Sequence, residues 1–186
     1  DRQDREGRRA QWNGMNALPP LSLTELSTKV GHELGLSEWR TVSQDMINRF
    51  ADATDDHQFL HIDPERAAKE GPFGGTIAHG FLTVALLSHL RESAFHIDGQ
   101  TMGVNYGFNR LRFTAPVLAG SRIRGHFVLH EIEDLPGGVQ TTWKCTVERE
   151  HSDKTGAGVV AIGKETMAMR SYLELFSFDG SKQRQK

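Results

Sequence analysis

The sequence predicts an α+β fold in which a bent antiparallel sheet wraps around one buried helix. Helical periodicity dominates the first half of the chain, whereas the second half is strand-like and rich in Val, Thr, Ile and aromatic residues. Between the two halves, the segment from Thr76 to about Phe95 is apolar nearly all round, as expected of a helix that is buried on most sides. Consecutive strands with short connections favour antiparallel pairing. A sheet of such strands that encloses the buried helix must also be strongly bent.

Shorter elements in the first half are marked by capping residues. Ser43 can cap a helix in which Met46, Ile47, Phe50 and Ala51 share one face. The other expected elements are a helix over 22–29 that stops before Gly31, a short extended segment over 36–42, and a helix that begins at Asp63-Pro64 and ends at Gly71-Pro72.

Four strands are expected in the second half, over 102–113, 122–132, 139–150 and 158–172. The sequence Leu-Pro-Gly-Gly over 135–138 predicts a hairpin turn, and the polar run 152–156 predicts another loop. Two glycine-rich stretches, 156–161 and 158–164, resemble nucleotide-binding loops. The surrounding residues favour a strand over the required helix, and Glu165 stands where a phosphate loop needs Ser or Thr.

The composition fits one globular domain. With 186 residues, of which 37% are hydrophobic and 25% charged, the chain is long enough to bury a core without disulfides or metals. We expect a single domain over 21–178, a mobile basic arm over 1–20 and a loose polar tail over 179–186.

Charge and cysteine content exclude several classes of protein. A net charge of −2 gives no basic field for nucleic acid or an anionic membrane. Cys145, the single cysteine, rules out an intrachain disulfide and a cysteine-only zinc site, and its strand context predicts a buried small residue. The start of the chain shows no signal peptide, and the longest apolar run falls short of the ~20 residues that a membrane span needs. The sequence therefore predicts a cytoplasmic protein.

Ionisable side chains concentrate in the loop over 50–63, directly before the apolar segment. Loops that carry Asp and His beside a core element often hold acid–base chemistry, although acidic residues also simply end and solvate helices. His57 and His61 are four residues apart, as in some zinc sites, with Asp56 and Asp63 nearby. The loop has no His-Glu motif and offers no convincing third ligand, so we expect no metal.

Three ordered blocks, over 55–61, 73–82 and 104–117, carry a more specific pattern. They read Asp-Asp-His-Gln-Phe-Leu-His, Phe-Gly-Gly-Thr-Ile-Ala-His-Gly-Phe-Leu, and a stretch that ends in Arg-Phe-Thr-Ala-Pro-Val. These blocks resemble the MaoC-like family, the (R)-specific enoyl-CoA hydratases, and above all its nodulation protein N-like subgroup. The family's first motif is Gly-Asp-x-Asn-Pro-(Leu/Ile)-His, so Asp55 replaces a glycine and Phe59 a proline, and both replacements bear on the geometry of the loop.

The resemblance implies a hot-dog fold and a set of site residues. Asp56 and His61 become the catalytic pair, and the backbone N–H of Gly80 becomes the oxyanion donor. The residues implied to bind or orient the substrate are Gln58, Phe59, Ile77 and His79. For His79, a structural role in the core is the competing interpretation.

The function implied by the resemblance is reversible addition of water to a trans-2-enoyl-CoA, with no cofactor beyond the thioester substrate. Two alternatives stay open: a hot-dog thioesterase, in which Asp56 would activate water against the carbonyl, and a non-catalytic module that binds acyl thioesters. The resemblance also implies a homodimer. Acyl chain length, and the choice between CoA and carrier-protein thioesters, are not fixed by the sequence.

Overall fold

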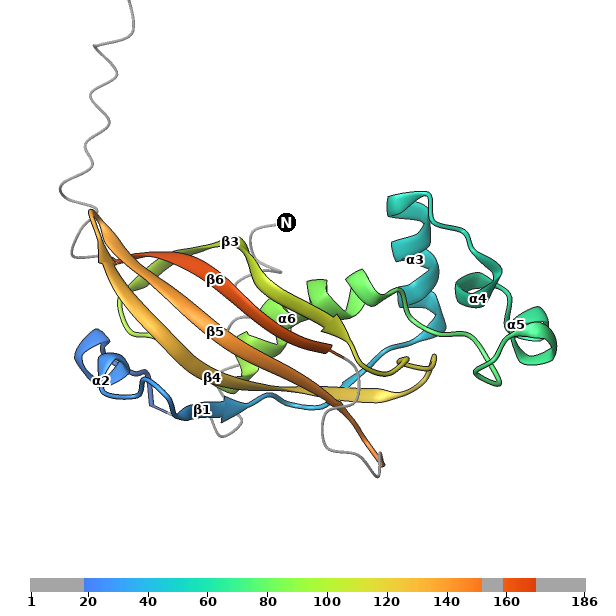
Figure 1. Ribbon diagram of the computed structural model, residues 1–186, viewed down its shortest axis with the longest axis horizontal. Coiled ribbons are helices and arrows are strands. Elements are labelled where there is room, and N and C mark those ends of the chain that lie inside the picture. Colours follow the sequence, from blue (N-terminus) through green and yellow to red (C-terminus); the bar gives the residue numbers. More distant parts are fainter. Residues whose placement is uncertain (1–18, 152–158, 170–186) are drawn as a thin grey trace, which may run out of the picture.

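The computed structural model describes residues 19–151 and 159–169. Six strands of these residues form one curved antiparallel sheet, and the long helix α6 runs along its concave side (Figure 1). The predicted α+β arrangement around a central helix is therefore confirmed. Residues 1–18 of the expected arm over 1–20, the loop over 152–156 and the tail over 179–186 lie outside the described residues. The predicted domain limits stay predictions.

The helices are α2 (Leu23–Ser27), α3 (Gln44–Thr54), α4 (Phe59–Ile62), α5 (Pro64–Glu70) and α6 (Gly80–Ala94). Three of the expected capping signals are present. The Ser43 hydroxyl accepts from the N–H of Met46 at the start of α3, and Asp63 caps α5 with Pro64 in its first turn. Gly71 ends α5, as predicted. The short helix α4 lies inside the segment expected to be a loop.

The strands are β1 (Glu33–Leu36), β2 (Arg40–Thr41), β3 (Gln100–Phe113), β4 (Arg122–Leu135), β5 (Gly138–Arg149) and β6 (Val159–Met169). The sheet order is β1-β4-β5-β6-β3, with β2 also paired to β4. The predicted hairpin turn joins β4 to β5, with Gly137 at a φ of 90°. Because the described part of the glycine-rich region is strand β6, the strand interpretation is confirmed there and no helix follows the glycines.

The start of the central helix differs from the sequence prediction. We expected helix from Thr76, but α6 begins at Gly80. Backbone hydrogen bonds tie residues 76–78 to the chain after β3 instead: Ala78 donates to Val117, Ala119 donates to Thr76, and Ile77 forms an isolated bridge with Leu118. These bonds keep the three residues 76–78 out of the helix, and periodicity could not reveal them because their partners lie about 40 residues away.

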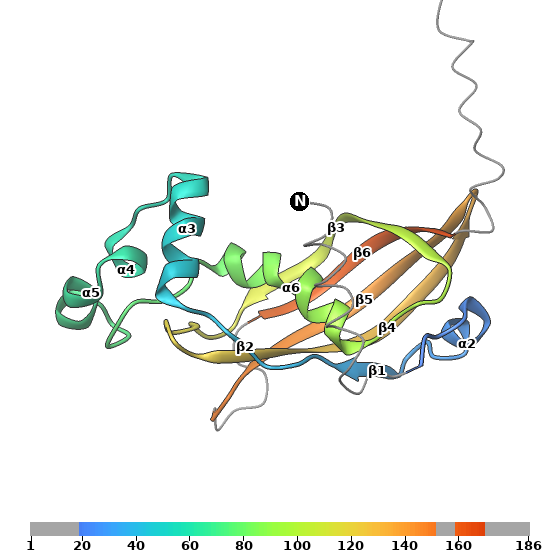
Figure 2. The same cartoon turned by 180° about the vertical axis from the view of Figure 1, so that it is seen from behind.

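The core fills the space between α6 and the sheet. Leu82, Leu87 and Leu90 of α6 are buried, and they join a cluster that includes Phe127 of β4 and Trp143 of β5. The helix is less enclosed than its composition predicts, because Phe81 is 67% exposed. Helices α3, α4 and α5 lie together beyond the N-terminal end of α6 (Figure 2). None of the described helices is long and apolar enough to cross a membrane.

Candidate active site

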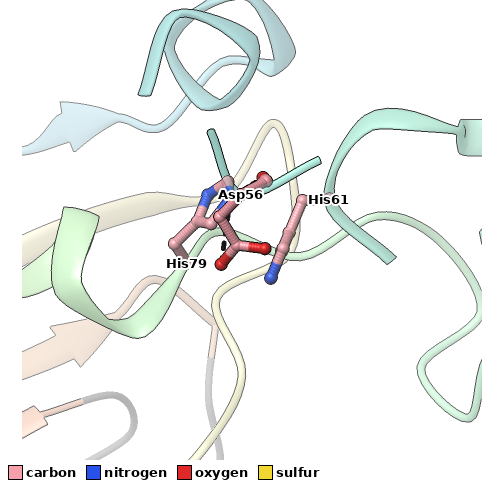
Figure 3. A group of neighbouring side chains, drawn as sticks. All are labelled: Asp56, His61 and His79. Carbon is pink, nitrogen blue, oxygen red and sulfur yellow. Dashed lines mark hydrogen bonds and ion pairs between the residues drawn. The ribbon is translucent and has the colours of Figure 1, made fainter. Parts of the chain in front are cut away.

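Three ionisable side chains meet at the N-terminal end of α6. One ligating atom each from Asp56, His61 and His79 lies within 4.8 Å of the other two. The two imidazole rings stack with their centroids 3.7 Å apart, and the Asp56 carboxylate lies beside both rings (Figure 3). The sequence-predicted pair of Asp56 and His61 is thus brought together, and His79 joins it.

Asp56 owes its position to a sharp turn at the end of α3. Asp55, the C-cap residue, adopts the left-handed conformation with φ 56° and ψ 21°, which turns the chain out of the helix. The Asp56 side chain is 56% exposed, so a substrate or a water molecule can reach its carboxylate. The pKa of the nearby His57 is raised, mainly by its hydrogen bond to Asp52 at 3.0 Å. The charge of Asp52 and the backbone and charge of Asp55 raise it further.

His61 is held in one orientation by the backbone of the segment before α6. Its ring Nδ1 lies 2.7 Å from the carbonyl oxygen of Ile77. Because a carbonyl oxygen can only accept a hydrogen bond, the neutral ring carries its proton on Nδ1 and leaves a lone pair on Nε2. The Ile77 N–H in turn donates to the carbonyl of Leu60 at 2.9 Å. Ile77 therefore orients His61 through its backbone.

His79 is buried beneath this pair and contacts the backbone of Asp56. The ring is 4% exposed, and its Nε2 lies 3.0 Å from the Asp56 carbonyl oxygen and 3.9 Å from the carboxylate. The Phe50 ring packs against it with centroids 5.1 Å apart. By the same rule, Nε2 donates its proton to the Asp56 carbonyl. His79 is thus both a core residue and a direct support of the Asp56 turn.

Gln44 is a site residue that sequence reasoning missed. Its side-chain amide donates to the carbonyl of His61 at 2.7 Å, and its side-chain oxygen accepts from the buried hydroxyl of Thr76 at 2.5 Å. One amide therefore joins α3, the end of α4 and the segment before α6. The sequence signal was weak, since Gln44 reads only as the first residue after a Ser43 cap.

Gly80 is the first residue of α6, directly after His79. The first backbone N–H groups of a helix have no acceptor within the helix, and the His79 side chain does not cap this one. The helix dipole adds partial positive charge at the same end. A Cβ at position 80 would lie 2.7 Å from the Phe113 ring, so close packing against β3 accounts for the glycine.

Gln58 and Phe59 lie near the cluster, but their side chains are not seen to contact Asp56 or His61. Gln58 is exposed at the N-cap of α4, and among the described residues no hydrogen bond joins its side chain to Asp56 or His61. Phe59 lies under the guanidinium group of Arg66 in α5, 4.2 Å from ring centroid to Cζ. Its ring therefore fastens α4 to α5, and roles for either side chain toward a substrate stay predictions.

The same three side chains lie close enough together to hold a metal ion, and His57, the other histidine of the spacing weighed in the sequence, is not among them. His57 instead pairs with Asp52 on the outside of the loop. The absence of a metal stays a prediction.

Cys145 is buried, and this burial raises the pKa of its thiol to about 12, as expected for a structural residue and not a nucleophile.

Comparisons with known proteins agree with this arrangement. A family model described as "MaoC like domain" matches residues 25–150. Nodulation protein N of Rhizobium meliloti is 54% identical over 136 residues, which cover 72% of this chain and 84% of the relative. The 3-hydroxyacyl-thioester dehydratase Z of Mycobacterium tuberculosis is 50% identical over 134 residues, which cover 72% of this chain and 88% of the relative.

Among solved structures, the R-hydratase PhaJ1 from Pseudomonas aeruginosa, in its unliganded form, superimposes with a TM-score of 0.59. The two chains are 27% identical, and the match covers 78% of this chain and 84% of that one. The expected hot-dog fold is thereby confirmed. Since the family match spans the first five strands of the sheet, the central helix and the Asp56–His61–His79 cluster, the chain belongs to the MaoC-like dehydratase family.

Proposed function

We propose that this protein is an (R)-specific enoyl-thioester hydratase that adds water reversibly to a trans-2-enoyl-CoA, with Asp56 and His61 as the catalytic pair. The observation that carries the proposal is the meeting of an accessible Asp56 carboxylate and the free Nε2 lone pair of His61 at the positive end of α6. The names of the relatives, a 3-hydroxyacyl-thioester dehydratase and an R-hydratase, support the same reaction class.

In the proposed reaction, Asp56 and His61 bind one water molecule between them. The water oxygen bonds to C3 of the enoyl group while one of its protons passes to the pair, and the pair delivers a proton to C2. The C2–C3 double bond becomes a single bond, and negative charge builds transiently on the thioester oxygen. The Gly80 N–H and the α6 dipole would stabilise that charge, for which one backbone donor typically contributes about 2.7–4 kcal/mol.

No step of this reaction requires a metal or a redox cofactor, and the acyl thioester is the substrate. His79 acts in the proposal as a positioning residue, because its hydrogen bond holds the Asp56 backbone. Gln44 holds the backbone of His61 in the same way.

We also propose that two copies of the chain associate through β3, which lies at one edge of the sheet. Its exposed apolar side chains are Met102, Val104, Tyr106, Phe108 and Phe113. Two copies of an edge strand can pair antiparallel about a two-fold axis, so a second copy is the partner that this surface fits best.

The test is loss of the conjugated enoyl-thioester absorbance with crotonyl-CoA. We expect wild-type turnover, and a loss of at least about a hundredfold in kcat for Asp56→Asn and for His61→Ala, with thermal melting nearly unchanged. An active Asp56→Asn variant would overturn the assignment. Free thiol released from a saturated acyl-CoA would instead identify a thioesterase, and tight thioester binding without turnover would identify a binding module.

A further inference from the structure

A cavity of about 220 Å³ lies between α6 and the sheet. One of its walls is a single face of α6, formed by Val84, Leu87, Ser88 and Arg91 at spacings of three and four residues. The opposite wall is the sheet, with Gly103 of β3, Trp143 of β5 and Glu165 of β6 among the lining residues.

The cavity begins about one helical turn beyond the proposed oxyanion donor, which does not itself line it. Val84 follows Gly80 by four residues and so lies on the same helix face one turn along, and Arg91 lies about 16 Å from Gly80 along the axis. Strand β3 follows the same path in the opposite direction, with Phe113 against Gly80 and Phe108 lining the cavity. An acyl chain whose thioester oxygen reached Gly80 would therefore enter the cavity beside Val84.

The far end of the cavity is polar. Arg91 and Glu165 form an ion pair with 3.5 Å between Nε and Oε2, and their side chains are only 15% and 14% exposed. Arg91 also donates from Nη2 to the side-chain oxygen of Gln100 at 3.0 Å. Gly103 makes room for this group, because a Cβ there would collide with the Glu165 carboxylate and approach the Gln100 amide at 2.8 Å.

This polar group has one unused donor. The buried Nε of Arg91 makes no hydrogen bond to any of the described residues, although the Glu165 carboxylate is near. A buried donor without an acceptor is costly and uncommon in native structures, so a ligand oxygen that moved in between Nε and the Glu165 carboxylate would bind favourably. The charges of Arg91 and Glu165 cancel, and Glu92, which also lines the cavity, is exposed. A carboxylate at this end would find no net positive charge.

We propose that Arg91, Glu165 and Gln100 make the acyl cavity selective for acyl groups that end in an uncharged oxygen function, a hydroxyl or a ketone, over fully aliphatic chains of the same length. A terminal hydroxyl accepts from Arg91 and donates to Glu165, whereas a terminal methyl offers neither group a hydrogen bond and excludes water from the ion pair. This selectivity rests on the proposed function, since it assumes that the thioester binds at Gly80.

The experiment compares trans-2-dodecenoyl-CoA with its ω-hydroxy counterpart in hydration, and dodecanoyl-CoA with ω-hydroxydodecanoyl-CoA in binding by calorimetry. For the wild type we expect the hydroxylated compound to be preferred about tenfold in kcat/KM and in affinity, as one hydrogen bond to a charged group provides. The double variant Arg91→Met/Glu165→Leu removes both charges together and leaves no unpaired buried charge. It should lose the preference or favour the methyl-ended chain.

The exposed ion pair of Asp45 and Arg49 on α3 provides the matched control, and Asp45→Asn/Arg49→Gln should keep the wild-type preference. Equal or better use of the methyl-ended compounds by the wild type would overturn the inference, whatever the variants do. If the double variant does not fold, Gln100→Leu should still reduce the preference, and an undiminished preference would count against it. A binding preference without any hydration would overturn the proposed function and support this selectivity.

Discussion

Asp55 preserves a backbone turn that usually requires glycine. Its left-handed conformation, with φ of 56°, is unfavourable for most L residues, and Asp tolerates it better than most because its short side chain can hydrogen-bond locally. The family motif has glycine at this position, so the replacement keeps the turn that presents Asp56. We therefore expect the replacement of glycine by Asp55 to affect the free energy of unfolding more than the position of Asp56.

We expect Asp55→Gly to raise the free energy of unfolding by about 0.5–1 kcal/mol, because glycine adopts the left-handed region without strain. Urea denaturation followed by circular dichroism measures the change. As a control, Ala53→Gly in the regular part of α3 should lower the same free energy by about 1 kcal/mol. If Asp55→Gly were also destabilising, the Asp55 side chain would have to make a stabilising interaction that outweighs the strain.

His79 should act on catalysis through the position of Asp56. Removal of the hydrogen bond in His79→Leu frees the Asp56 carbonyl, and displacement of a catalytic group by about 1 Å can reduce the rate about a hundredfold. We expect kcat to fall by about ten- to a hundredfold with little change in KM, while His79→Gln, which retains a donor, recovers part of the loss. Steady-state kinetics with crotonyl-CoA measures both. An unaltered kcat in His79→Leu would limit His79 to a packing role.

At the level of elements, local signals in the sequence predicted most of the architecture. The Ser43 and Asp63 caps, the hairpin turn at Gly137 and the strand-like second half depend on residues near one another in the chain, so a sequence pattern can express them. The start of α6 could not be predicted in this way, because it depends on the bridge between Ile77 and Leu118. The short helix α4 was hidden inside a loop-like run of polar residues.

The same distinction between local and long-range signals applies to the residues of the candidate site. Asp56 and His61 were predicted from one contiguous family motif, over 55–61, and Gly80 from a second, over 73–82. Gln44 was missed because its two partners, His61 and Thr76, lie 17 and 32 residues away, and only the packing of α3 against α4 brings them together.

The contacts of Gln44 lead to a prediction about how α3 holds the end of α4 and the segment before α6 in place. Gln44→Met keeps the side-chain volume but leaves the carbonyl of His61 and the buried hydroxyl of Thr76 without this partner, which should cost about 1–3 kcal/mol of folding free energy. We expect kcat to fall as well, since His61 loses a restraint. Chemical denaturation and crotonyl-CoA hydration report the two effects. The exposed variant Arg49→Gln on the same helix loses only a surface ion pair with Asp45 and should change neither strongly. A silent Gln44→Met would mean that α4 is held in place by its other contacts.

In the molecule as a whole, much of the exposed apolar surface lies on one edge strand of the sheet, β3. Strand β3 has almost every residue exposed, including Tyr106 at 73% and Val104 at 50%, although it lies beside the cavity and ends at the active site. A long exposed apolar edge strand invites pairing with another chain unless it is covered. A second copy joined through β3 would cover this edge and would enclose the region between α6 and β3 from outside.

We therefore expect the wild-type protein to have about twice the 20.8 kDa mass of the chain in light scattering coupled to size exclusion. The double variant Val104→Glu/Tyr106→Glu should shift the protein to monomer, because like charges would face each other across the two-fold axis. Both side chains are exposed in the single chain, so its fold should tolerate the change. Val30→Glu, at an exposed apolar residue outside β3, is the matched control and should remain dimeric. A dimer that persists in the Val104→Glu/Tyr106→Glu variant would place the interface elsewhere, and the exposed side chains of β3 would then need another partner.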